Sequence, residues 1–540
     1  MPINPQADKV YVINNKPVPV ALNAQDDGGN NVELSTTSEG HLEVEIHGPR
    51  LPFGSVHTES LTPIFQSDAV YGLNSGQCLA TTSGSGTATA VNSAFVVTTG
   101  TTIYSQGVIQ SHKRLRYRAG QGFVGRFAGY FTTPVANSYQ LAGFGHAEDG
   151  VYFGYREIAS GTPAFGILYT NRGTREVRTL TVSVGASSAS NATITLDGTA
   201  TVVALTAASN IQRTVWELSV ATYAGWNAYP NGATVLFVAA ATGAKAGAFT
   251  FGAGTTGASA SFATTKTGVS ETQTWIPQST WNGDKLDGTG SSGVTIDPTK
   301  GNVYQIGLQY LGFGAFDFKI EAAASGNNPT FITVHTVRLP NTLTATSFGN
   351  PSFPFTMAAY SAGSTTDLAV RVGSFAGFIE GAKVLHGNRF SYFNSSTAVD
   401  ASSYRCLFTI LNGRYYGSRT NQSVINMLSV SGALKHTSPC VFYLFKNATL
   451  VGNPNFSSYS TLSSSLWDTA ATTCTIANNE QLLWTGHLGD TGEIDHHFSN
   501  GTYNAEELTI QPGEWITLAC RSITGTPAYV TGSINTREDQ

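Results

Sequence analysis

Two runs of alternating residues near the middle of the chain constrain its fold more than any other feature. Between residues 303 and 310, large apolar side chains occupy every second position. Between residues 316 and 321, Phe316, Phe318 and Ile320 alternate with three charged residues. Gly312 and Gly314 separate the two runs. Because side chains of a strand point alternately to opposite faces, this pattern predicts an antiparallel hairpin with one buried face and one solvated face.

The composition extends this prediction to the whole chain. Only 12% of the 540 residues are charged, about half of the usual ~25%. Long helices normally carry Glu and Lys on their solvated side, and these are scarce here, whereas Thr, Val, Tyr and Phe are abundant. We therefore predict a mainly β fold. A surface with so little charge also favours a protein that buries much of its exterior against copies of itself.

Turn residues at regular spacing predict a domain order. Residues 1–60 resemble an extended N-terminal arm or anchor, and residues 61–381 predict a β-sandwich of the jelly-roll or concanavalin-like type. A small α+β insertion, residues 178–273, interrupts this sandwich. Its one predicted helix spans residues 210–223 and is capped by Asn210. Residues 382–540 predict a C-terminal β-sandwich domain.

One strand near residue 116 carries a basic stripe. Arg114, Arg116 and Arg118 alternate with Leu115 and Tyr117, so the three guanidinium groups share one face. The alternatives are a solvated face, which is the commoner outcome, and a surface that binds an acidic patch on a partner.

The net charge and the hydropathy of the chain limit the classes of partner that it can bind. A net charge of -5 and a pI near 6.1 give no signature of polyanion binding, so we expect no nucleic acid partner. No apolar run approaches the ~20 residues of a membrane span, so we expect no membrane association. The five cysteines are far apart, which predicts free thiols in a reducing compartment, with a Cys440–Cys474 pair as the alternative.

Several sequence blocks carry a family resemblance. They are HLEVEIHGPRLPFGSVHTESLTPIFQSDAVYGLN, RLRYRAGQGFVGRFAGYF, TWNGDKLDGTGSSGVTIDPTKGNVYQIGLQYLGFG, NPSFPFTMAAYSAG, GSFAGFIEG and the final NTREDQ. Together they resemble a family of virion structural proteins of tailed bacteriophages and large DNA viruses. Members of that family are surface or tail-associated β-rich proteins, and the likeness is weakest over residues 390–500. The family brings no catalytic residues to transfer.

The resemblance implies a non-enzymatic structural component of a virus particle, such as an exposed capsid decoration, a fibre or a tail-associated protein. We expect it in the virion after assembly in the host cytoplasm, as a homo-oligomer, trimer or higher, beside neighbouring virion proteins. The first alternative is a receptor-binding fibre or adhesin that recognises a host surface glycan. The second is a polysaccharide depolymerase, although the sequence shows no recognisable catalytic motif.

Loop carboxylates are the candidates for a cofactor. We expect no cofactor apart from a possible structural calcium ion. Its ligands would be Asp284, Asp287 and Asp297, which flank the loop WNGDKLDGTG. The spacing is not that of an EF-hand and lacks a closing Glu, so turn-forming aspartates are the simpler interpretation. His487 to His497, with its acidic residues, is a second possible metal cluster or else a polar loop.

Aromatic residues are the candidates for glycan binding. Trp467, Trp484, Tyr415 and Tyr416 are possible platforms on which sugar rings stack. Large aromatic side chains dominate protein cores and interfaces as well, so a packing role is the main alternative.

Overall fold

The computed structural model describes residues 61–323, 329–381, 387–394, 397–435, 438–475, 481–489, 492–498, 508–524 and 527–539, together with the backbone of short strands between residues 12 and 33. The chain divides into two units, Met1–Thr58 and Glu59–Gln540. In the first unit the strands form two antiparallel pairs: β1 (Val12–Ile13) with β2 (Lys16–Pro17), and β3 (Asn23–Gln25) with β4 (Asn31–Glu33). The alternation of Leu42, Val44 and Ile46 is typical of a strand, and these residues lie outside the described ones.

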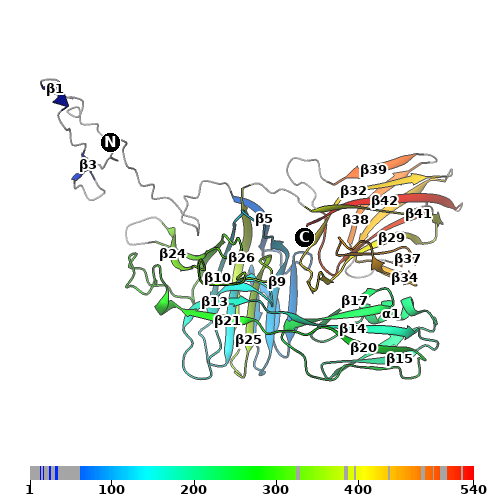
Figure 1. The fold of residues 1–540 in the computed structure, drawn as a ribbon, viewed down its shortest axis with the longest axis horizontal. Coiled ribbons are helices and arrows are strands. Elements are labelled where there is room, and N and C mark those ends of the chain that lie inside the picture. The colour runs from blue at the N-terminus through cyan, green and yellow to red at the C-terminus, as the bar shows by residue number, and fades with distance from the viewer. Residues whose placement is uncertain are drawn as a thin grey trace. The chain divides into compact units, whose positions relative to one another are not determined.

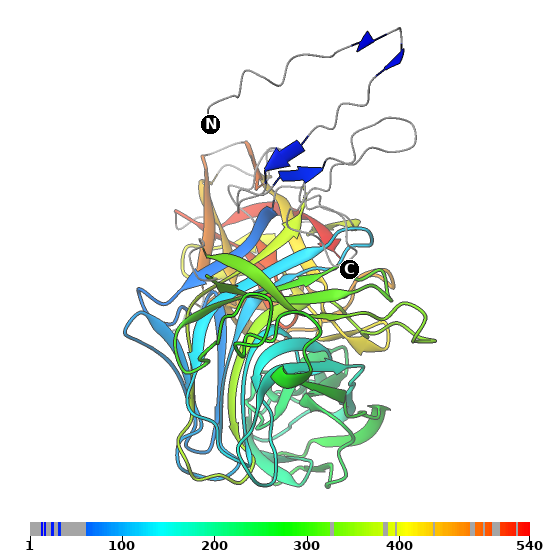
Figure 2. The ribbon, with the colours of Figure 1, turned by 90° about the vertical axis from the view of Figure 1, so that its left-hand side faces the viewer.

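The second unit is mainly β, as predicted, and begins with two large antiparallel sheets (Figures 1 and 2). The strands of the first sheet are, in order, β24 (Thr330–Val337), β23 (Phe316–Ala322), β22 (Asn302–Leu308), β10 (Phe123–Phe131), β26 (Ala369–Glu380), β8 (Ala94–Thr98) and β7 (Thr87–Val91), with β5 (Leu61–Asp68) also on β26. The strands of the second are β21 (Thr272–Pro277), β13 (Phe165–Asn171), β12 (Gly150–Tyr155), β11 (Ser138–Gly145), β25 (Phe353–Ser361), β9 (Gln106–Leu115) and β6 (Cys78–Ser83). We call this part the first sandwich.

The predicted hairpin is β22 and β23, which pair antiparallel with Tyr304 opposite Ile320. Its apolar face is buried, as expected, but the prediction of a solvated opposite face is wrong. Gln305, Asp317 and Lys319 are buried as well. Two polar contacts lie on that face: Lys319 pairs with Asp317 at 2.9 Å, and Gln305 accepts a hydrogen bond from Arg126.

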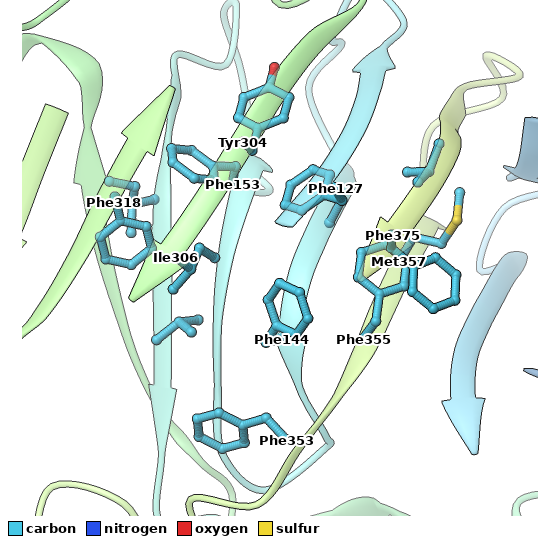
Figure 3. Close-up of a cluster of buried hydrophobic side chains, with 14 of the residues drawn as sticks. Phe127, Phe144, Phe153, Tyr304, Ile306, Phe318, Phe353, Phe355, Met357 and Phe375 are labelled. Carbon is cyan, nitrogen blue, oxygen red and sulfur yellow. The ribbon is translucent and has the colours of Figure 1, made fainter. Parts of the chain in front are cut away.

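Aromatic rings fill the space between the two large sheets (Figure 3). Phe127 stacks on Tyr304 with ring centroids 4.9 Å apart, and Phe355 stacks on Phe375 at 4.1 Å. Phe153 meets Phe318 edge to face at 5.4 Å. Burying large rings from both sheets is the main stabilising contribution to such a sandwich.

An inserted module, residues 172–271, leaves the first sandwich at the end of β13 and returns at the start of β21. It holds a four-stranded sheet of β17 (Trp226–Asn231), β18 (Thr234–Thr242), β14 (Arg175–Val184) and β20 (Ser259–Lys266), and a three-stranded sheet of β16 (Thr199–Leu205), β15 (Ser190–Leu196) and β19 (Thr250–Gly252). The module has its own apolar core.

The predicted helix is α1 (Ile211–Val220) in this module. Asn210 caps it, as expected, because its side chain accepts a hydrogen bond from the backbone N–H of Arg213 at 3.0 Å. Val215 and Leu218 face the core of the module. No helix in the described part of the chain is long and apolar enough to cross a bilayer.

The C-terminal sandwich, residues 387–539, holds two further sheets. One contains β27 (Asn388–Phe393), β42 (Ala528–Asp539), β32 (Val424–Leu434) and β39 (Glu493–His497), with β28 (Thr397–Val399) and β40 (Thr509–Ile510) beside them. The other contains β34 (Thr449–Gly452), β37 (Ala471–Thr475), β29 (Tyr404–Asn412), β41 (Trp515–Ser522), β33 (Cys440–Lys446) and β38 (Gln481–Leu488), with β36 (Ser465–Asp468) and β35 (Ser457–Ser458) at one side. A hairpin, β30 (Tyr415–Tyr416) and β31 (Arg419–Thr420), projects from this part.

The inserted module packs against the C-terminal sandwich, as Figure 1 shows where β17 and α1 approach β34 and β37. Trp216 of α1 stacks on Phe456 at 5.7 Å and meets Trp515 edge to face at 5.9 Å. This apolar contact joins segments that are far apart in the sequence.

All five cysteines are free and buried. The alternative of a Cys440–Cys474 pair is wrong, because each thiol lies beside a different one: Cys440 contacts Cys520, and Cys474 contacts Cys406. The two cysteines sit on different strands of one sheet, β33 and β37, which are not neighbours.

Candidate functional site: a charged junction

The basic stripe of the first sandwich lies against the end of the C-terminal sandwich. Arg118 Nη2 is 3.0 Å from Asp539 Oδ2. Arg116 donates hydrogen bonds to the backbone carbonyl oxygens of Asp539 and Gln422. Both interpretations drawn from the sequence, a solvated face and a surface for an acidic partner, are therefore wrong for these two residues. Their charges bind the block RLRYR to the block NTRED within one chain.

The neighbouring carboxylate of Glu538 is fully buried and is held by serine residues. Ser463 Oγ donates to Glu538 Oε2 at 2.5 Å, and the backbone N–H of Ser464 donates to Oε1 at 2.7 Å. A buried carboxylate is tolerated only when such donors replace water. The Ser-rich loop before β36 supplies them.

A second group of charges lies at the turn between β11 and β12. Glu148 Oε1 accepts a hydrogen bond from Thr420 Oγ1 at 2.7 Å and is 3.6 Å from Arg175 Nε. Glu148 belongs to the first sandwich, Arg175 to the inserted module and Thr420 to the C-terminal sandwich. This one carboxylate therefore contacts all three parts. Burial raises the pKa of Glu148, and the charge of Arg175 opposes that rise.

Asp149, the next residue, binds two loops of the junction, the place where the first sandwich, the inserted module and the C-terminal sandwich meet around Glu148. Its carboxylate accepts hydrogen bonds from the backbone N–H groups of Arg172, Gly349 and Asn350 at 2.8 to 2.9 Å. Burial raises the pKa of Asp149, while these three donors act to lower it. Both carboxylates of this turn are buried, which no local pattern of the sequence indicates.

His146 completes the turn as a neutral imidazole. Nε2 donates to the carbonyl of Asn350 at 3.1 Å, and Nδ1 accepts from the backbone N–H of Glu148 at 3.2 Å. Burial, with the charges of Arg114 and Arg175, lowers the pKa of His146 to about 3. Both ring nitrogens are satisfied in the neutral form, so protonation would break one hydrogen bond.

Around Glu148 and Asp149, arginine side chains outnumber carboxylates. Burial, together with the charges of Arg116, Arg175 and Arg414, lowers the pKa of Arg114 to about 9. Nε and Nη1 of Arg114 are buried without a hydrogen-bond partner among the described residues. Buried donors of this kind are costly unless water or a ligand satisfies them.

A cavity of about 230 Å³ opens at the junction. Glu148, Asp149, Arg175 and Arg419 line it, and so does Tyr415. Of the aromatic residues predicted as glycan platforms, only Tyr415 lines this cavity. Its ring is half-buried, and burial raises the pKa of its hydroxyl.

The other three candidate platforms are also half-buried. Trp467 meets Tyr459 edge to face at 5.4 Å, and Trp484 stacks on His496 at 5.8 Å. The hydroxyl of Tyr416 donates to the carbonyl of Thr461 at 3.0 Å. Each ring has its own packing neighbours, and within the described ranges no ring contact joins any two of the four. Glycan stacking stays a prediction.

The structure does not gather the predicted calcium ligands around one point. Asp284 is buried and accepts hydrogen bonds from the backbone N–H groups of Leu286 and Ser292. Burial acts to raise the pKa of Asp284, but these donors hold it below its ordinary value. Gly290 passes so close that a Cβ there would lie 1.9 Å from the Asp284 carboxylate.

Asp287 and Asp297 each close a turn of their own. Their carboxylates accept hydrogen bonds from Thr289 and Thr299, respectively, which lower both pKa values. In the part of the chain that the structure describes, no three His, Cys, Asp or Glu side chains are grouped to hold a metal ion. These bonds fit the turn-forming interpretation, and calcium binding stays a prediction.

The His-rich segment forms β39, in part. His496 packs between Trp484 and Phe498, while His497 is exposed and lies 3.2 Å from Asp495. The two histidines therefore point to opposite faces, as their adjacency on a strand predicted. Asp490 lies outside the described residues.

Comparisons with known proteins assign no family. No family model matches the chain, and no curated protein matches it. Among solved structures, the Faustovirus major capsid protein aligns at 9% identity over 90% of this chain and 92% of that chain, with a TM-score of 0.11. A viral particle of IBDV aligns at 10% identity over 77% of each chain, with a TM-score of 0.11. The infectious bursal disease virus VP2 subviral particle aligns at 9% identity over 79% of this chain and 83% of that chain, also with a TM-score of 0.11. A TM-score of 0.11 is too low to establish a shared fold, so none of these alignments carries a function to this chain.

Proposed function

We propose that this chain is a non-enzymatic structural component of a virus particle, assembled as a homo-oligomer and displayed as a decoration, fibre or tail-associated protein. The quoted sequence blocks support the virion role through their resemblance to virion structural proteins. The observation that carries the assembly role is an edge of the first sandwich that no other described strand covers.

This open edge consists of β6, β7 and their flanking turns. β6 is the outer strand of one large sheet and β7 is the outer strand of the other. No Asp, Glu, Lys or Arg occurs between residues 69 and 111. The open edge also carries exposed large apolar side chains: Val70, Tyr71, Leu79, Val91, Ile103 and Tyr104.

Soluble monomers normally protect such edges with charges, prolines or bulges, because unpaired strand edges join other chains. The open edge lacks the first of these protections. An apolar, uncharged strand edge is stable when another subunit covers it. We therefore assign the open edge to contact with a second copy of the chain, and we expect more than ~2,000 Å² to be buried in an obligate interface of this kind.

The charged residues support the same proposal. Several charged residues, among them Glu148, Arg118 and Asp539, join parts of the chain to one another. Contacts of this kind hold the three parts together, which suits a component of an assembled particle.

The test is sedimentation velocity on the full chain across a range of concentrations. We expect an oligomer for the natural sequence and a monomer for Leu79→Lys combined with Val91→Lys, since lysine at an edge strand opposes pairing. The matched control is Val220→Lys, an equally exposed apolar position at the end of α1. A monomeric natural protein at high concentration would contradict the assembly role, and its absence from purified virions would contradict the virion role.

A further inference from the structure

The cavity at the junction has more cationic than acidic side chains around it. Arg172, Arg175, Lys266 and Arg419 line it together with Glu148 and Asp149. Four cations against two carboxylates leave a surplus of two positive charges. Arg114 and Arg414 lie close enough to act on Arg175 and on each other, and Glu514 offsets part of the charge of Arg414.

The two carboxylates already have partners inside the protein. Asp149 is held by three backbone N–H groups, and Glu148 by Thr420 and Arg175. By contrast, the described residues give no ion pair or hydrogen bond to the side chains of Arg172 and Lys266. The surplus charge therefore belongs to groups that are available to a ligand.

Two donors beside the cavity have no hydrogen bond within the described part of the chain, although Arg175 Nε is ion-paired with Glu148 Oε1 at 3.6 Å. Thr174 Oγ1 and Arg175 Nε are buried without a hydrogen-bond partner among the described residues. Each such group costs free energy unless it is satisfied. The cationic side chains that line the cavity favour a ligand rich in acceptor oxygen atoms.

Access and size suit a small ligand. Arg172 and Arg419 both line the cavity and are exposed, so solvent reaches it. A volume of about 230 Å³ holds a small tetrahedral ion with its waters, because a single water occupies ~30 Å³ in the liquid. Arginine is the side chain best suited to bind such ions through two parallel hydrogen bonds.

We propose that this cavity binds an oxyanion with two negative charges, of the phosphate or sulfate class, between the inserted module and the two sandwiches. Arg172, Arg175 and Lys266 come from the inserted module, and Arg419 comes from the C-terminal sandwich. Binding would join these parts across the cavity. The site does not depend on the virion role, since its geometry lies within one chain.

The test is titration calorimetry of the full chain with sodium phosphate and with sodium sulfate, at an ionic strength held constant with sodium chloride. We expect saturable binding of both anions and a higher melting temperature in their presence than in chloride alone. Lys266→Met and Arg172→Gln should each weaken binding about tenfold or more, because each removes a charge-assisted contact. Lys300→Met removes an exposed lysine elsewhere and should leave the affinity unchanged.

The result that would overturn the site is the lack of saturable binding of either anion up to ~10 mM, which corresponds to a negligible affinity. Equal affinity in the natural protein and in both cavity variants would also overturn it. Melting temperatures in chloride alone show whether each variant is folded. Because the Arg172 side chain is exposed, its variant keeps the test valid if Lys266→Met fails to fold.

A third titration distinguishes a free ion from a phosphate group on a larger molecule. Glycerol 3-phosphate binding more tightly than inorganic phosphate assigns the site to a phosphate ester, and weaker binding assigns it to the free ion. Either order supports the oxyanion site.

Discussion

Arg118 and Asp539 lie 421 positions apart in the sequence and form an ion pair of 3.0 Å. Their side chains are only 16% and 12% exposed. The pair joins the first sandwich to the end of the strand β42, which is a central strand of its own sheet. Contacts of this kind make the two sandwiches parts of one structural unit.

Removal of this pair should destabilise the protein measurably. A double-mutant cycle with Arg118→Met and Asp539→Asn should give a coupling energy of about 1–3 kcal/mol, because the pair is largely shielded from water. Urea unfolding followed by tryptophan fluorescence measures it. The exposed pair Lys300–Asp297, with side chains 80% and 45% exposed, is the control and should give less than about 0.5 kcal/mol. Equal coupling in the two cycles would contradict this structural role.

A methyl group at Gly125 should be poorly tolerated. A Cβ at this position of β10 would lie 2.2 Å from the ring of Phe144, which is fully buried in the core. We expect Gly125→Ala to destabilise the protein by about 1–3 kcal/mol, since the ring cannot move without disturbing its neighbours. Gly301→Ala, where nothing lies within 4 Å of the added Cβ, is the control. Thermal unfolding measures the effect, and an equal change of melting temperature in both variants would contradict the close packing at Gly125.

His146 should make the protein less stable as the pH falls from neutrality. Its pKa is about 3 in the folded chain and about 6.5 in an unfolded one. The unfolded state therefore binds a proton below pH ~6.5 that the folded state does not bind until pH ~3. Stability from this group is complete above pH ~6.5 and is lost progressively on acidification through that window.

The measurement compares urea unfolding at pH 7.5 and pH 5 for the natural protein and for His146→Gln. The natural protein should lose about 2 kcal/mol more than the variant between these pH values. The raised pKa values of Glu148 and Asp149 act in the opposite direction, since protonation of these groups favours the folded state. They are present in both proteins and cancel in the comparison. An identical pH dependence would show that the imidazole is not held neutral.

The five cysteines should be unreactive in the folded protein. All are buried, which keeps a reagent away from the thiols. Burial also raises the pKa of Cys78 to about 11, so little thiolate forms there at pH 8. The pKa of Cys440 is lowered by a hydrogen bond with Cys520, so its protection depends on burial alone. A thiol-reactive disulfide reagent should label none of them quickly in native conditions and all five after denaturation. One rapidly labelled thiol in the native protein would contradict the packing around that cysteine.

Local patterns in the sequence predicted much of the fold. The alternation at residues 303–321 gave the β22–β23 hairpin, and Asn210 with its apolar stripe gave α1. The local signal is mixed in β25, where Pro354 lies near the start of the strand and proline removes a backbone donor. The structure accommodates this proline beside a register shift between Pro354 and Thr356, which is where a strand tolerates the loss of a donor.

The junction could not be predicted in the same way. A stripe such as Arg114, Arg116 and Arg118 looks the same in a sequence whether its face meets water or another part of the chain. Glu148 and Thr420 are brought together by the docking of whole sandwiches, which no local pattern encodes. The one sequence feature that hinted at buried ion pairs was the scarcity of charged residues.

The inserted module begins and ends at neighbouring positions, since Asn171 and Thr272 are cross-strand partners in β13 and β21. Topologically it is the loop of a hairpin. An evolving lineage can thus exchange this whole segment for another while the register of the host sheet stays intact. Such an exchange would also replace Arg172, Arg175 and Lys266, which supply most of the positive charge facing Glu148. The ligand preference of the cavity would therefore be inherited with the module rather than with the sandwich.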